Sequence, residues 1–253
     1  MRGSIRTEPV MGTVITIDVR DDAVGEAAID AAMQWFHSVD SVFSTYRPDS
    51  EISRLGRGEL QTDACSADVR EVLRLCDEMR ARTEGCFDIN YGSAPDPSGL
   101  VKGWSVQRAA EQLEEAGARN FFINAGGDVV ARGEPEPGRL WRLGIRHPER
   151  ADRVAAVFGI TELAVATSGL YERGPHIVDP RSGATPIGLL SLTVAGPSLT
   201  HADAYATAGF VMGVAGAAWI ADLEGYEALA ITEEHRVLST PGMAALRANA
   251  GEP

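Results

Sequence analysis

The sequence predicts an α+β fold, a mixed α/β arrangement in which antiparallel-rich sheets are flanked by helices. Runs with alternating apolar positions and many β-branched residues indicate strands; these runs cover residues 10–19, 121–124, 140–146, 153–160, 162–167 and 191–194. Apolar residues at helical spacing indicate helices at residues 24–42, 66–83, 101–116 and 200–212. The two kinds of element alternate irregularly, which disfavours a regular doubly wound sheet.

The first half of the chain predicts one strand followed by helices. Alternation at residues 10–19 gives way to helical spacing that continues to Val42. Pro48 and its Asp and Ser neighbours mark a loop at residues 44–51. A further loop, rich in Gly, Pro and Ser, precedes the helix that we expect from residue 101.

The second half predicts most of the strands. Thr200 is expected to cap the helix that runs to Met212. A short helix near 215–223 and strands near 226–231 and 236–239 complete the expected core, and the tail after Pro241 is expected to be marginal. Since no repeat or linker interrupts the chain, we expect one domain over residues 1–253.

Composition excludes several classes of function. The 253 residues carry a net charge of −13, so the summed field repels nucleic acid and anionic membranes. An anionic ligand would need a metal ion, backbone N–H groups or a few placed basic residues. No apolar run reaches the length of a membrane span, and the first residues lack a signal sequence, which predicts a cytoplasmic protein. Cys65, Cys76 and Cys86 have neither disulfide nor zinc spacing.

Asp203 and Thr207 are the first candidates for a metal site. They lie four residues apart in a predicted helix, which puts both side-chain oxygens on one face. A carboxylate with a hydroxyl suits Mg²⁺, which keeps positions for water and phosphate. Such pairs also arise by chance, and Asp203 could lie in the first helical turn only because the helix dipole stabilises a negative charge there.

Two glycine-containing segments could admit a ligand close to the backbone. In the segment at residues 96–103, Asp96 opens a turn and Lys102 starts a helix, where N–H groups can hold an anion. Gly126 and Gly127 follow a strand end, and a plain turn explains them equally well.

His176 is the candidate base. It precedes an acid and a rigid turn at residues 177–180, and a neutral imidazole could accept a proton from an attacking hydroxyl. A histidine in a loop is also commonly a surface residue. His201, close to Asp203 in sequence, is the second choice.

In this order, the segments resemble the ApbE family of FAD:protein FMN transferases, in a short cytoplasmic form. Each piece is weak alone, but their shared order and spacing are specific. The matching pieces are Met11-Gly12-Thr13, residues 44–51, Phe87-Asp88-Ile89, residues 96–103, residues 124–128, Thr167-Ser168-Gly169, residues 176–183, and Asp203 to Thr207 followed by Val211-Met212-Gly213.

The resemblance implies a T-fold-like architecture and a role for each piece. Asp203, Thr207 and the backbone carbonyl of Gly99 are implied to bind Mg²⁺, and His176 is the implied base. The residues implied to contact FAD are Met11, Tyr46, Phe87, Asp88, Ile89, Asp96, Lys102, Gly126, Gly127, Ser168 and Ile177.

The implied reaction is phosphoryl transfer. A Ser or Thr hydroxyl of a client protein attacks the FMN-side phosphorus of FAD, the base takes its proton, and AMP leaves. Hydrolysis of FAD to FMN and AMP, or FAD binding without catalysis, are alternatives; the metal pair argues against the last. The chain departs from many relatives in the short connection at residues 90–95, and in Pro97 and Trp104.

Overall fold

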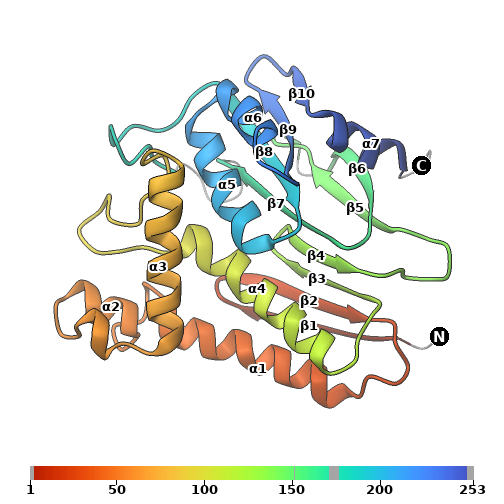
Figure 1. Cartoon of the computed structure of the whole chain (residues 1–253), viewed down its shortest axis with the longest axis horizontal. Coiled ribbons are helices and arrows are strands. Elements are labelled where there is room, and N and C mark those ends of the chain that lie inside the picture. The colour runs from red at the N-terminus through yellow and green to blue at the C-terminus, as the bar shows by residue number, and fades with distance from the viewer. Residues whose placement is uncertain (1–2, 151, 171–176, 250–253) are drawn as a thin grey trace.

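The computed structural model describes residues 3–150, 152–170 and 177–249. Within these residues, eight strands form one sheet in the order β1-β2-β3-β4-β7-β8-β9-β10, and every neighbouring pair is antiparallel (Figure 1). The strands are β1 (Ser4–Val10), β2 (Thr13–Val19), β3 (Phe121–Ala125), β4 (Asp128–Arg132), β7 (Leu163–Gly169), β8 (Leu189–Gly196), β9 (Glu227–Thr232) and β10 (Val237–Ser239). The antiparallel sheet with flanking helices confirms the predicted fold class.

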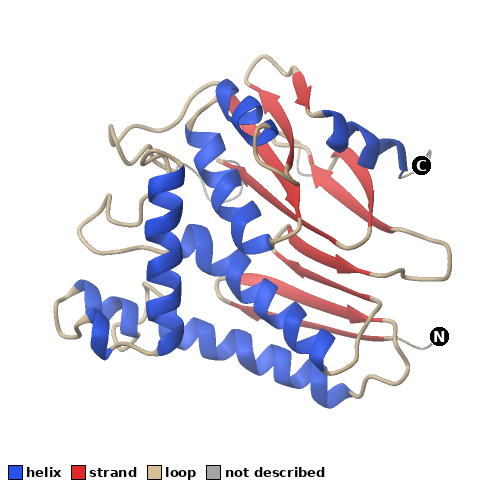
Figure 2. Cartoon of the chain, viewed as in Figure 1, coloured by secondary structure: helices blue, strands red, loops and turns tan. Residues whose placement is uncertain are grey.

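Helices cover one face of this sheet (Figure 2). α1 (Glu26–Phe43), α4 (Ser98–Glu115), α5 (Leu199–Val211) and α6 (Val214–Ala221) pack on the sheet, whereas α2 (Glu51–Gly56) packs on α1, and α3 (Ala67–Arg82) packs on α4 and follows a 3₁₀ turn at Thr62–Ala64. The main core lies between this layer and the sheet, and Phe36, Trp104 and Phe210 are among its fully buried side chains. Full burial of each such side chain contributes about 1.5–3 kcal/mol.

A smaller layer covers part of the opposite face. The hairpin of β5 (Trp141–Arg146) and β6 (Val154–Ile160) lies there together with α7 (Pro241–Asn249). Phe158 and Met243 are fully buried against Val129 of the large sheet in a second core. The tail after Pro241, expected to be marginal, is therefore a helix, because Met243 anchors it to this core.

Two tight turns account for the differences between the predicted and the observed strands in this part of the sheet. The strand predicted at residues 10–19 is β2 from Thr13 onward, and it is preceded by a turn that links it to β1, where Met11 and Gly12 both have positive φ, 55° and 67°. Gly126 and Gly127, with φ of 59° and 100°, link β3 to the unpredicted β4 in the same way. Positive φ at both central residues is the requirement of the type I′ turn, a common turn of two-residue hairpins. Because β2 pairs with β3, the two turns lie at the same end of the sheet.

No helix in the described ranges is both long enough and apolar enough to cross a membrane.

Candidate functional site

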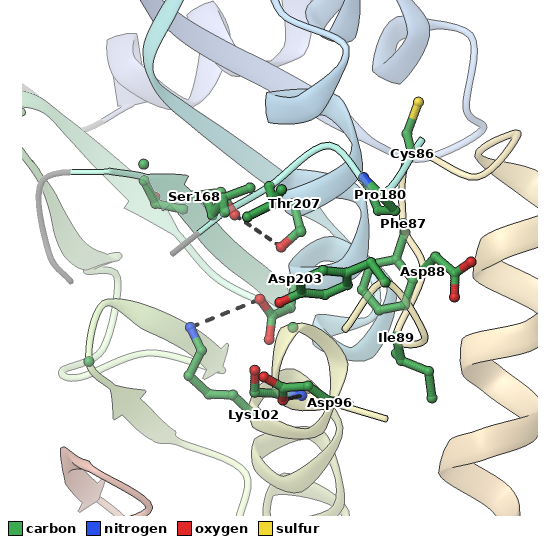
Figure 3. A pocket seen from close by; sticks show the side chains of 18 of the residues that line it. Cys86, Phe87, Asp88, Ile89, Asp96, Lys102, Ser168, Pro180, Asp203 and Thr207 are labelled. Atoms are coloured by element: carbon green, nitrogen blue, oxygen red, sulfur yellow. Dashed lines mark hydrogen bonds and ion pairs between the residues drawn. The ribbon is translucent and has the colours of Figure 1, made fainter. Parts of the chain in front are cut away.

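A cavity of about 520 Å³ opens at the sheet end that carries the two hairpin turns. It lies between these turns, the first turn of α4, the end of β7 and one face of α5 (Figure 3). The described residues that line it are Gly12, Thr13, Cys86, Phe87, Asp88, Ile89, Tyr91, Asp96, Ser98, Gly99, Lys102, Gly126, Arg146, Thr167, Ser168, Gly169, Ile177, Val178, Pro180, Asp203 and Thr207.

Asp203 is held in place by the neighbouring helix α4. Its side chain is almost fully buried, and its Oδ2 accepts a hydrogen bond from the backbone N–H of Gly103 at 2.9 Å. A Cβ at position 103 would lie 2.7 Å from Asp203 Cβ and 2.5 Å from the Leu199 carbonyl oxygen. Only glycine therefore lets α4 and α5 approach closely enough for this bond.

Thr207 lies one turn further along α5 and faces the same cavity. Its Oγ1 is 3.3 Å from Ser168 Oγ at the end of β7 (Figure 3). A Cβ on Gly99 would lie 3.7 Å from Thr207 Oγ1, so the backbone of α4 passes close to this hydroxyl. The structure thus brings Gly99, Asp203 and Thr207 together from segments about a hundred residues apart.

Lys102 connects this group to β4. Its ammonium forms an ion pair with Asp128 and lies 3.9 Å from Asp203 Oδ1. Asp128 is 1% exposed and also accepts a hydrogen bond from the Thr167 N–H at 3.3 Å. Much of the charge of Lys102 is therefore balanced by two buried carboxylates, as expected for buried ionic groups.

The two hairpin turns pack against each other at the cavity wall. A Cβ at Gly126 would lie 2.3 Å from Thr13 Oγ1, so the close contact of the turns requires glycine there. The Gly126 N–H also donates to the Val14 carbonyl at 3.2 Å. Both turns line the cavity, through Gly12 and Gly126, and a ligand contact at Gly126 stays a prediction.

The oxygen atoms of Gly99, Asp203 and Thr207 suit a Mg²⁺ ion. The Gly103 N–H, which helix geometry directs toward the Gly99 carbonyl, also donates to Asp203 Oδ2. A carbonyl oxygen has two lone pairs, so that of Gly99 could bind an ion as well. A carboxylate, a hydroxyl and a carbonyl form an all-oxygen donor set that leaves room for water and phosphate oxygens. In the described residues, no cluster of three His, Cys, Asp or Glu side chains offers an alternative metal site.

Comparison with known proteins decides the family. A sequence model of the ApbE family matches residues 11–96 and 93–230, which is most of the chain. The chain belongs to the ApbE family. Curated relatives include the FAD:protein FMN transferase of Haemophilus influenzae, 28% identical over 80% of this chain and 79% of the relative, and that of Vibrio cholerae, 27% identical over 81% and 80%. The curated relatives of this chain in the family are therefore transferases.

Solved ApbE structures share the fold. The flavin transferase ApbE from Vibrio cholerae superimposes with a TM-score of 0.85 over 97% of this chain and 99% of that one, at 22% identity. The flavinyl transferase ApbE from Pseudomonas stutzeri, in its apo form, gives 0.84 over 100% and 98%, at 23% identity.

The residues after α3 that match the ApbE family lie in the cavity wall. The Phe87 N–H donates to Thr83 Oγ1 at 3.0 Å, and Asp88 forms an ion pair with Arg80 at 2.8 Å. The short connection at residues 90–95 closes on itself, because the Asp96 N–H donates to the Ile89 carbonyl at 2.9 Å.

Two titratable side chains of the cavity wall, Cys86 and Tyr91, stay protonated at neutral pH. Burial raises the pKa of the Cys86 thiol, which makes it a poor nucleophile. Burial and then the charge of Asp96 raise the pKa of Tyr91. Neither group is thus arranged as an ionised nucleophile in the cavity.

Some predicted residues lie outside the cavity wall. Tyr46 is 97% exposed, and Gly127 and Met11 belong to the hairpin turns without lining the cavity. Met11 instead packs on the core, with its sulfur 3.7 Å from Ser105 Oγ. His176 lies outside the described residues.

His201, the second choice as base, contacts a different part of the fold. Its Nδ1 is 3.1 Å from Ser198 Oγ and its ring lies 5.8 Å from that of Tyr205, and it is not among the residues that line the cavity.

Sequence reasoning missed several lining residues. Arg146 ends a strand-like run and belongs to no motif, so only the fold could bring it to the cavity. Thr13, Gly12 and Thr167 were in matching pieces, but no chemistry pointed to them individually.

Proposed function

We propose that this ApbE-family chain transfers FMN from FAD to a Ser or Thr hydroxyl of a client protein, with Mg²⁺, and releases AMP. The names of the curated relatives support FAD as donor and a protein as acceptor. The observation that carries the proposal is the position of Asp203 and Thr207 on one face of α5, toward a cavity that Lys102 and Gly126 also line.

Mg²⁺ would be held by Asp203, Thr207 and the Gly99 carbonyl. When bound, it would draw charge from the pyrophosphate and favour its cleavage. The Gly103 N–H keeps the carboxylate of Asp203 oriented, and Ser168 does the same for the hydroxyl of Thr207. These contacts limit the reorganisation that binding would require.

The protein's part is mainly to bind and orient FAD. Ser98 and Gly99 put the N-terminal end of α4 at the cavity, where the helix dipole favours an anion. The predicted contacts at Phe87, Asp88, Ile89, Asp96, Ser168 and Ile177 all lie in the cavity wall, which supports their role toward FAD. Tyr46, Met11 and Gly127 remain predictions from the family resemblance.

The transfer step needs only one base, because a single proton leaves the client hydroxyl. The client oxygen forms a bond to the FMN-side phosphorus, the bridging P–O bond breaks, and AMP departs with the bonding electrons. His176 remains the predicted acceptor of the hydroxyl proton. One domain over residues 1–253 and a cytoplasmic location also remain predictions of the sequence.

The test is AMP release from FAD and Mg²⁺ with and without a candidate client, together with flavin fluorescence of the client after denaturation. We expect AMP and labelled client to appear in equal amounts. Equal AMP release without the client, and no labelled product, would indicate an FAD hydrolase. An Asp203→Asn variant, which keeps the shape of the side chain, should lose Mg²⁺-dependent turnover while its circular dichroism stays unchanged.

A further inference from the structure

Arg146 reaches the cavity from the smaller layer of the fold. Trp141, Leu143 and Ile145 of β5 are buried against the large sheet, and the alternate residues face outward. Arg146 is the last residue of that outward row and lines the cavity, although β5 belongs to a separate two-stranded sheet.

A β-bulge sits at the point where Arg146 turns into the cavity. Ile145 pairs with Ala156, but Arg146 pairs with Val154, so the register shifts between these two residues of β5. The extra residue is Ala155 of β6, so the bulge bends β6 and increases the twist of the hairpin beside the end of β5, and bulges are enriched beside active sites. Arg142, four residues earlier in the same outward row, lines a separate hollow beside Trp141.

The balance of charge in the cavity gives Arg146 a role. Asp88, Asp96 and Asp203 line the cavity, and the cationic side chains among its described lining residues are Lys102 and Arg146. Lys102 already forms ion pairs with Asp128 and Asp203. A further positive group would therefore favour the entry of a pyrophosphate into this acidic protein.

We propose that Arg146 binds a phosphate oxygen of FAD and so determines the affinity for the anionic part of the substrate. The inference rests on the proposed function, because it takes FAD as the ligand. A guanidinium has five N–H donors in a planar fork that matches phosphate, so it can bind one alongside a protein partner. A guanidinium offers donors and no acceptor, which restricts Arg146 to binding.

The experiment compares equilibrium binding of FAD and of riboflavin, which lacks phosphate, to the whole chain with Mg²⁺ present. Arg146→Gln should weaken FAD binding about 10- to 100-fold, the effect typical of a lost charge-assisted hydrogen bond. Riboflavin binding should stay within about twofold. Arg146→Lys, which keeps the charge but not the fork, should lie between. The matched control is Arg142→Gln, which removes the same charge from the same strand and should change neither affinity.

Three results would overturn the inference. Unchanged FAD affinity in Arg146→Gln would remove the phosphate contact, and equal weakening of FAD and riboflavin would indicate a structural role. Equal loss in Arg142→Gln would indicate only the general field of the protein. Normal FMN transfer by the wild type with any of these results leaves the proposed function intact. Failure of the wild type to bind FAD would instead overturn both proposals.

Discussion

The backbone N–H of Gly103 donates to Asp203 Oδ2 at 2.9 Å, across a hundred residues of sequence. The bond joins α4 to α5 at the point where both face the cavity. It fixes one oxygen of the carboxylate and leaves the other, Oδ1, 3.9 Å from Lys102 Nζ. The packing of two helices and the orientation of the proposed metal ligand therefore depend on the same glycine.

Gly103→Ala should lower both stability and metal affinity. The added methyl group would meet the Leu199 carbonyl oxygen at 2.5 Å and Asp203 Cβ at 2.7 Å, so the helices must separate. Overpacking of this kind costs about 1–3 kcal/mol, and each kcal/mol lowers Tm by about 2–4 °C in a chain of this size. Thermal unfolding and Mg²⁺ titration measure the two effects.

Gly144→Ala is the control for this substitution. A Cβ there would lie at an ordinary 3.5 Å from Val154 Cγ1, so its Tm should hold or rise slightly. Equal stability of the two variants would show that the close approach of α4 and α5 is not limiting.

Lys102→Met should destabilise the fold more than loss of a surface ion pair. It leaves Asp128, 1% exposed, without its cation, and an uncompensated buried charge costs about 3–5 kcal/mol. Adding Asp128→Asn should restore about 1–3 kcal/mol, because the two sites are coupled. Urea unfolding with a chelator present, so that no metal replaces the lysine, gives these values.

Arg108→Met provides the comparison within α4. Its ion pair with Glu71 is partly exposed, with 43% and 32% of the two side chains accessible, so its loss should cost about 1 kcal/mol. An equal cost for Lys102→Met and Arg108→Met, or no recovery in the double variant, would contradict the burial argument.

Local patterns in the sequence predicted most of the fold. The spacing of apolar residues predicted α1 and α3 within two residues at each end, because each helix buries one continuous face. Alternation could not locate the turn at Met11 and Gly12, because a methionine with positive φ has no sequence signature. The docking of α7 through Met243 depends on a second core that local patterns do not reveal.

The candidate site was predicted where its members share one element. The spacing of Asp203 and Thr207 needs only the geometry of a helix. Asp128 was noted in a glycine turn, but its ion pair with Lys102 depends on how β4 packs beside α4. The position of Arg146 at the cavity depends on a separate two-stranded sheet and on a bulge in it, and neither feature is visible in the sequence.

Thr207→Val should weaken Mg²⁺ activation, whereas Thr207→Ser should preserve it. Valine keeps the shape of threonine but replaces the hydroxyl that we propose as a ligand, while serine retains the oxygen. Because even outer partners of a metal site change affinity by about 10- to 100-fold, we expect at least a tenfold rise in the Mg²⁺ concentration for half-maximal AMP release.

Ser168→Ala separates ligation from simple hydrogen bonding near Thr207. It removes the group 3.3 Å from Thr207 Oγ1 but leaves the proposed ligand, so its effect should be smaller than that of Thr207→Val. The same Mg²⁺ requirement in Thr207→Val and wild type would exclude the hydroxyl from the metal site.

Stability should fall as pH decreases below about 6.5, and His201 should cause part of this fall. Burial, followed by the positive charge of Arg82, lowers the pKa of His201 below its usual 6.5, against an opposing effect of Glu78. Below pH 6.5 the unfolded chain therefore binds a proton that the folded chain does not, which favours unfolding. Above this pH the imidazole is neutral in both states and the contribution is constant.

His201→Gln should therefore flatten the dependence of Tm on pH between 7 and 5.5. Glutamine carries no titrating proton but can still bond to Ser198, which lies 3.1 Å from His201 Nδ1. His37→Gln is the control, because His37 is a half-exposed histidine paired with Glu8. An identical slope in His201→Gln and wild type would show that the ring is accessible enough to titrate normally. A flatter slope would instead show that burial and the charge of Arg82 disfavour the protonated form of His201 in the folded chain.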